Sequence, residues 1–214
     1  MTSSLDKPRK FLQRRGYNKK TSLAKVESAL VVCLDCSGSM GKGSKMTTAW
    51  NAFKQELVPN LGSVDLGVLC FPNPEDWVQK FAWRPTPVKL PDLDQLGMPR
   101  PAGGTPMLAG LTEARKWLKE HVKRARIILI TDGQAGDANN EKIISEAGSW
   151  GIPIDCVGIW GQYASRFESY DKEFLEELAE VTGGLFKEVK DIATLNQFIK
   201  QLSPAERPML MAPK

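Results

Sequence analysis

The chain has 214 residues, of which 42% are hydrophobic, and a formal net charge of +4. This length fits one α/β domain of the larger kind, with a core that needs no disulfides. Four cysteines inside apolar runs do not suggest the disulfide framework of a small secreted protein. The sequence contains neither an apolar run of transmembrane length nor an apolar N-terminal signal, so we predict a cytoplasmic protein with no membrane partner.

The positive charge is concentrated at the N-terminus. Residues 1–25 contain eight of the 29 Lys and Arg residues and one acidic residue, whereas the remainder has slightly more acidic than basic residues. We therefore predict a basic arm over 1–27, a folded domain over 28–202 and a C-terminal tail over 203–214. The arm is suited to nucleic acid or to an acidic partner surface, although charge runs of this kind are usually solvated tails.

The predicted domain begins with an apolar strand over 28–35, whose Val and Leu residues show no polar alternation. Such a run is typical of a central parallel strand buried on both faces. A helix is expected over 45–58, with Ser44 as its N-cap and a Met-Trp-Phe stripe on one face. Strands are expected over 64–71 and 77–83, and the short Pro-rich turn between them predicts a hairpin with an antiparallel edge strand.

Residues 84–103 contain five prolines and little periodicity, which predicts a long loop of a kind that is usually functional or disordered. A helix is expected to follow over 106–121, capped by Thr105. Strands and helices then alternate to the end of the domain, over 126–131, 139–150, 153–159, 171–182, 185–189 and 191–202. This alternation predicts a doubly wound, mostly parallel α/β sheet with helices on both faces.

Oxygen-bearing side chains follow two of the predicted strands. Asp35, Ser37 and Ser39 come directly after the first strand, and Asp132 follows the strand that ends at residue 131. Because the carboxyl ends of parallel strands meet at one edge of a sheet, these residues can converge there, and Thr105 enters from the start of a helix on the same rim. Two carboxylates so close would repel each other without a cation, and oxygen-only ligands suit Mg²⁺ or Ca²⁺. The sequence predicts a metal site with a position open to an outside oxygen.

These donors resemble the complete metal-ion-dependent adhesion site of the von Willebrand factor A (VWA) domain family. The resemblance lies in three motifs in the expected order: Asp35-x-Ser37-x-Ser39, Gly103-Gly104-Thr105-Pro106 and Asp132-Gly133. It covers residues 28–202 and implies a Rossmann-like sheet of six strands with one antiparallel edge. It also implies that Mg²⁺, or Mn²⁺ or Ca²⁺ in its place, is bound directly by the hydroxyls and mostly through water by the aspartates.

The resemblance implies a binding function without catalysis. In this family an acidic side chain of a partner completes the metal shell. We therefore predict a metal-dependent protein-interaction module, in which Mg²⁺ bridges to a Glu or Asp of a partner protein. Stand-alone microbial domains of this type often act together with MoxR-type AAA+ ATPases or in stress-response complexes. By analogy, we expect the partner to be a protein of one of these systems.

Three alternatives are weighed against this function. Nucleic-acid association through the basic arm is the first. The second is Mg²⁺-dependent phosphotransfer with Asp35 as nucleophile, as in haloacid-dehalogenase-like phosphatases. Those enzymes have a second Asp where this chain has Ser37, and no other carboxylate is evident for the acid–base step. The third is a redox or zinc role for Cys33-x-x-Cys36, which straddles a strand end and has no second cysteine pair.

Overall fold

The computed structural model describes residues 26–72, 79–84, 97–133, 135–159, 171–189, 191–203 and 210–211. Its strands are β1 (Val26–Asp35), β2 (Asp65–Phe71), β3 (Gln79–Arg84), β4 (Val122–Thr131), β5 (Ile154–Ile159), β6 (Phe186–Val189) and β7 (Leu210–Met211). Its α-helices are α2 (Lys45–Ala52), α4 (Met107–His121), α5 (Asn140–Gly148), α6 (Lys172–Thr182) and α7 (Ile192–Gln201). The basic arm up to residue 25 and most of the Pro-rich loop lie outside the described residues. Within the described part of the chain, no helix has the length and apolar character needed to cross a membrane.

Five parallel strands form the centre of the sheet, in the order β2-β1-β4-β5-β6. β3 pairs antiparallel with β2 and ends the order on that side. β7 was not expected: it pairs antiparallel with Arg124 and Ala125 of β4, just before β5 begins to pair with β4 at Ile127. The expectation of six strands is therefore one short of the described sheet. A two-residue strand in a Pro-rich tail is too short to show the alternation that identifies strands.

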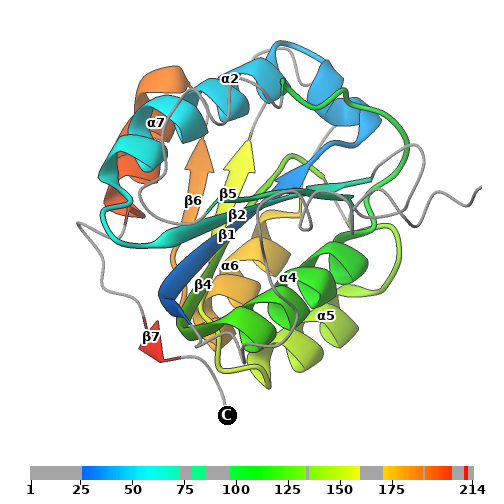
Figure 1. Cartoon of the computed structure of the whole chain (residues 1–214). Helices are drawn as coiled ribbons and strands as arrows, with labels where there is room; N and C mark the ends of the chain where they lie inside the picture. The colour runs from blue at the N-terminus through cyan, green and yellow to red at the C-terminus, as the bar shows by residue number, and fades with distance from the viewer. Residues whose placement is uncertain are drawn as a thin grey trace, which may run out of the picture.

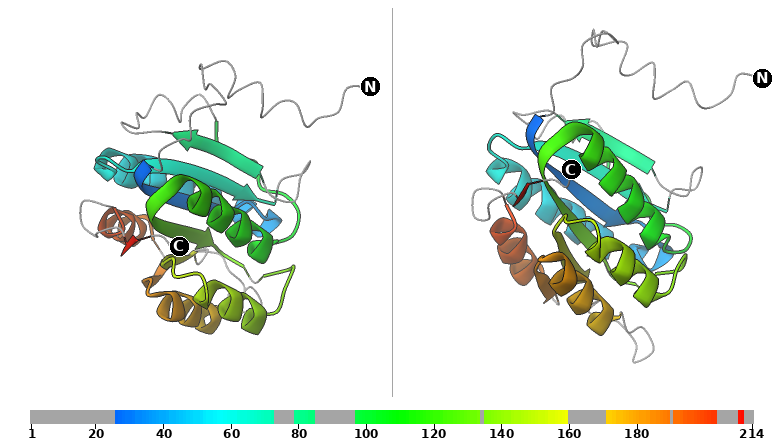
Figure 2. Two further views of the ribbon diagram at one scale, coloured as in Figure 1. Left: turned by 60° about the horizontal axis from the view of Figure 1, so that its bottom comes forward. Right: turned by 90° about the horizontal axis from the view of Figure 1, so that it is seen from below.

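Strand β1 is buried on both faces, as its continuous apolar run predicts. Its side chains alternate between two hydrophobic clusters, with Leu30, Val32 and Leu34 in one and Ala29, Val31 and Cys33 in the other. The first cluster includes residues of α2 and α7, which Figure 1 shows over one face of the sheet. The second includes residues of α4, α5 and α6, which lie side by side over the other face in Figure 2. The doubly wound α/β prediction is confirmed, and β1 and β4 end next to each other at the same edge.

The helix predicted over 45–58 begins at Lys45 as expected, but the predicted cap and the C-terminal end differ from the structure. Ser44 precedes it with a left-handed φ of 62°, and the Ser44 side chain makes no capping hydrogen bond. The α-helix stops at Ala52 and continues as a π-helical turn (η2, Phe53–Leu57) and a 3-10 turn (η3, Val58–Asn60). The predicted apolar stripe is nevertheless buried, because Met46, Trp50, Phe53 and Leu57 all belong to the core.

The ends of the last two helices agree with the sequence signals. Gly183 ends α6 with a left-handed φ of 72°, a conformation that glycine adopts without steric penalty. Asp191 precedes α7, and its carboxylate accepts a hydrogen bond from the Thr194 N–H at 2.8 Å. Local signals of this kind therefore predicted where these helices begin and end.

Candidate metal site

The first part of the site is the loop that follows β1. Asp35 is fully buried at the end of the strand. Its Oδ1 accepts a hydrogen bond from the Ser37 N–H at 2.7 Å, and its Oδ2 accepts one from the Thr131 hydroxyl at 2.5 Å. The chain then makes a 3-10 turn, η1 (Gly38–Gly41), and the hydroxyl oxygens of Ser37 and Ser39 lie 2.9 Å apart. The Asp-x-Ser-x-Ser spacing thus brings three oxygen-bearing side chains together.

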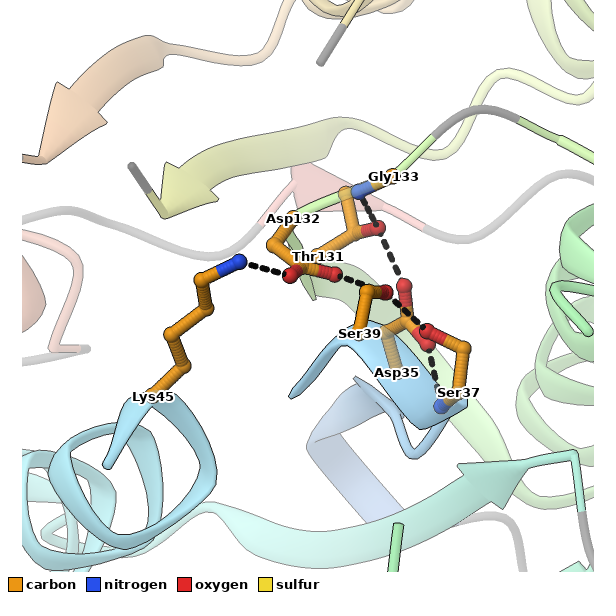
Figure 3. A network of polar contacts seen from close by, with 7 residues as sticks. All are labelled: Asp35, Ser37, Ser39, Lys45, Thr131, Asp132 and Gly133. Carbon is orange, nitrogen blue, oxygen red and sulfur yellow. Dashed lines mark hydrogen bonds and ion pairs between the residues drawn. The ribbon is translucent and has the colours of Figure 1, made fainter. Parts of the chain in front are cut away.

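Ser39 connects this loop to a second carboxylate. Its hydroxyl donates to Asp132 Oδ1 at 2.8 Å and lies within hydrogen-bond distance of the Ser37 hydroxyl. Asp132 directly follows β4, the neighbour of β1, and only 8% of the residue is exposed. The structure therefore brings Asp35, Ser37, Ser39 and Asp132 into one network of side chains (Figure 3).

Thr105 lies beside this network, at the start of α4. A Cβ atom built on Gly133 would lie 3.5 Å from Thr105 Oγ1 and 3.8 Å from Asp35 Oδ2. The two oxygens thus border the same space, which the missing side chain of Gly133 leaves open. Among the three predicted hydroxyl ligands, Ser37, Ser39 and Thr105, only the Thr105 hydroxyl makes no hydrogen bond to another described residue.

The prediction that Thr105 caps α4 is wrong. The Leu108 and Ala109 N–H groups in the first turn donate to the two oxygens of the Asp137 carboxylate, at 3.1 and 2.8 Å. Asp137 comes from the loop after β4, so it acts across a long sequence separation that no local pattern reveals. Because Asp137 caps the helix, the Thr105 hydroxyl is left for the site.

Main-chain hydrogen bonds join the three loops that carry the donors. They run from the Gly38 N–H to the Gly103 carbonyl (3.1 Å), from the Ala102 N–H to the Cys36 carbonyl (2.7 Å) and from the Gly136 N–H to the Thr105 carbonyl (2.7 Å). The relative positions of the loops are therefore set by the backbone as well as by the donor side chains.

Lys45 belongs to the site, although the sequence did not single it out. It is the first residue of α2, it is 7% exposed, and its ammonium forms an ion pair with Asp132 Oδ2 (Figure 3). Together with Ser39 on Oδ1, it gives each Asp132 oxygen a donor. Lysines are rarely buried unless they are paired, and the pairing partner lies far away in the sequence. Only the folded chain identifies it.

The charge of Asp35 is strongly affected by its surroundings. Burial raises the pKa of its carboxyl from 3.8 to about 6, and the hydrogen bonds from Thr131 and Ser37 oppose this rise. A nearby cation would favour the ionised form. Two carboxylates and three hydroxyls are also the oxygen-rich donor set of a hard cation. Within the described residues, no group of three or more His, Cys, Asp and Glu side chains could hold a metal without the hydroxyls. The residues therefore fit Mg²⁺.

The Cys33-x-x-Cys36 alternative finds no support in the geometry. Cys33 packs in the cluster under α4, α5 and α6, whereas Cys36 belongs to the cluster on the opposite face. Burial raises the pKa of the Cys33 thiol well above its usual value. A thiol that stays protonated is a poor nucleophile and a poor metal ligand, so Cys33 is a core residue.

Comparison with known proteins finds a family model that matches part of the chain. Residues 30–134 match the family model of the von Willebrand factor type A domain. No curated protein matches the chain.

Several solved structures share the fold. A von Willebrand factor type A protein from Catenulispora acidiphila is 20% identical, with a TM-score of 0.67, over 84% of this chain and 43% of that one. The ArnB paralog VWA2 from Sulfolobus acidocaldarius is 17% identical, with a TM-score of 0.61, over 84% of this chain and 46% of that one. The SpRpn10 VWA domain is 14% identical, with a TM-score of 0.62, over 85% of this chain and 98% of that one. The chain thus spans less than half the length of the first two proteins.

Identities this low establish similarity of fold alone. Residues 30–134 thus resemble the von Willebrand factor type A domain in sequence, and the fold of the chain is similar to that of solved VWA structures.

Proposed function

We propose that this domain binds a protein partner through a divalent cation. VWA domains are generally protein-interaction modules. The cation would be Mg²⁺, with Mn²⁺ or Ca²⁺ as alternatives, and its ligands would be Asp35, Ser37, Ser39, Thr105 and Asp132. The observation that carries the proposal is the hydrogen-bonded chain from Ser37 through Ser39 to Asp132 beside the buried Asp35 carboxylate.

The donor set favours a partner that supplies a carboxylate. Mg²⁺ prefers six oxygen ligands and often retains waters, so a set with three neutral hydroxyls leaves room for an oxygen from outside. Two carboxylates balance the charge of a divalent cation, and the Lys45 ammonium adds a further positive charge at the rim. An acidic side chain is therefore the partner group that this site attracts most strongly.

The setting that we propose is cytoplasmic, with a MoxR-type AAA+ ATPase or a stress-response complex as the source of the partner. Support for this setting comes from the resemblance to stand-alone microbial VWA domains.

The experiment is a pull-down from native lysate in Mg²⁺ and again in EDTA, with Asp35→Ala as the metal-site control. Partners retained only with metal and intact Asp35 would support the proposal and identify the pathway. Partners indifferent to both changes would contradict it.

Thr105→Ala separates binding from folding. It removes one oxygen from the proposed ligand set, so it should weaken partner binding by about tenfold or more while thermal unfolding changes little. Thr112→Ala is the control, because Thr112 is an exposed threonine on α4, the helix that follows Thr105; it should leave partner binding unchanged and raise stability only slightly. If Thr105→Ala lowered binding and stability equally, the hydroxyl would be structural rather than a ligand.

A second candidate function uses the basic arm to bind nucleic acid. It is motivated by the eight basic residues within residues 1–25. Deletion of these residues should abolish nucleic-acid binding and leave the Mg²⁺-dependent interaction intact. Nucleic-acid binding that survived the deletion would rule out the arm. Phosphotransfer remains the least favoured alternative, because Ser37 stands where the acid–base carboxylate is needed.

A further inference from the structure

Lys45 is buried at a position that disfavours a positive charge. It is the first residue of α2, and the N-terminal end of a helix carries a partial positive charge that repels cations. Burial adds a desolvation penalty, since only 7% of the residue is exposed. The Asp132 carboxylate offsets both effects through its ion pair with the ammonium. The location of Lys45 is therefore explained by the site rather than by the helix.

The ion pair changes the charge that the donors present. Asp35 and Asp132 are the two carboxylates of the set, and the Lys45 ammonium neutralises one of them. The number of negative ligands is a main determinant of how tightly an oxygen site binds a divalent cation. An ammonium on Asp132 Oδ2 either competes with the cation for that carboxylate or repels it across a short distance. Both effects act in the same direction and weaken binding.

We propose that Lys45 is an internal counter-cation that sets the affinity of this site for divalent cations. The inference rests on the proposed function, since it concerns the same site. Without a bound cation, Lys45 keeps Asp132 neutralised and in position to accept the Ser39 hydrogen bond. With a cation, it lowers the affinity, so the site loads at a higher Mg²⁺ concentration than its five oxygen donors alone would require.

The test is a calorimetric Mg²⁺ titration of the whole chain and of Lys45→Met, which keeps an unbranched side chain without the charge. The Mg²⁺ dissociation constant of the variant should be at least about tenfold lower. In EDTA, its melting temperature should fall by several degrees, because Asp132 is then buried without a counter-charge. These two changes have opposite signs, whereas the loss of a merely structural lysine would lower stability without tightening Mg²⁺ binding.

Two further variants control for charge and for folding. Lys42→Met removes an exposed lysine just before α2 and should leave the Mg²⁺ affinity unchanged. Lys45→Gln retains a hydrogen-bond donor for Asp132, so it replaces Lys45→Met in the titration if the latter does not fold.

The outcomes separate this inference from the proposed function. If the native chain binds Mg²⁺ and both neutral Lys45 variants bind it no more tightly, the inference is overturned and the proposed function stands. If neither the native chain nor the variants bind Mg²⁺, both fail. If only the neutral variants bind Mg²⁺, Lys45 blocks the site in the native chain, which supports the inference and overturns the metal bridge to a partner.

Discussion

Two buried cation–carboxylate pairs include a residue of β4 or the residue after it, and the pairs differ in their other hydrogen-bond partners. In the middle of the strand, Arg126 Nε lies 3.7 Å from Asp155 Oδ2 on β5. The same guanidinium donates to the Leu202 carbonyl at 3.1 Å, and the Leu185 N–H donates to Asp155 Oδ1 at 2.8 Å. After the end of the strand, Asp132 pairs with Lys45, and its other oxygen accepts from a serine hydroxyl.

The difference shows that a buried ion pair alone does not identify a functional site. Arg126 and Asp155 have main-chain partners, so they tie the sheet to the end of α7 and to the segment before β6 as part of the fold. Asp132 has side-chain partners, the Ser39 hydroxyl and the Lys45 ammonium, which a cation could replace without disturbing the backbone. The pair in the middle of β4 is therefore structural, and the pair after the end of the strand is suited to binding.

The largest effect is expected at the structural pair. Arg126→Met leaves Asp155 buried without its cation and removes the hydrogen bond to Leu202, so it should lower the free energy of unfolding by about 3–5 kcal/mol. Urea denaturation measures this loss. Adding Asp155→Asn keeps an acceptor for the Leu185 N–H and removes the unpaired charge, so the double variant should recover part of the stability. A large change in Mg²⁺ affinity in the folded Arg126→Met variant would contradict the purely structural role of the Arg126–Asp155 pair.

An intermediate effect is expected at Gly133, which borders the candidate metal site. Gly133→Ala places a methyl group at ordinary contact distance from Thr105 Oγ1 and Asp35 Oδ2, at 3.5 and 3.8 Å. The fold should tolerate it, with a change in unfolding free energy below about 1 kcal/mol. The methyl group fills the space between the donors, so Mg²⁺ affinity should fall about tenfold or more by calorimetry. Unchanged Mg²⁺ affinity would mean that the cation does not occupy this space.

The smallest effect is expected at a carboxylate outside both pairs. Hydrogen bonds from the Thr194 N–H and hydroxyl hold the pKa of the exposed Asp191 below 3.8. A carboxyl whose pKa is lowered by folding stabilises the native state above its unfolded pKa, and this contribution is lost as the pH falls through the folded pKa. Asp191→Asn should therefore slightly reduce the loss of melting temperature below about pH 4. A larger pH dependence in the variant than in the native chain would contradict this assignment.

The sequence predicted the parts of the site that have local signatures. The apolar run ending at Asp35, the serines spaced after it and Asp132 after β4 are all recognisable within a few residues, and parallel strand order brings their ends together. Lys45, Arg126 and the α4 cap were not predictable in this way. Each depends on one side chain meeting a partner many residues away, and nothing around Lys45 marks it as different from the exposed Lys42.

The main-chain hydrogen bonds between the three donor loops have a consequence for how the site binds. They make the site preorganised: much of the conformational entropy lost in bringing the loops together is lost when the domain folds, not when a ligand arrives. A small ligand can then bind without ordering the loops, and removing one donor oxygen leaves the other donors where they were. Each single-donor variant of this domain therefore reports on the oxygen that it removes.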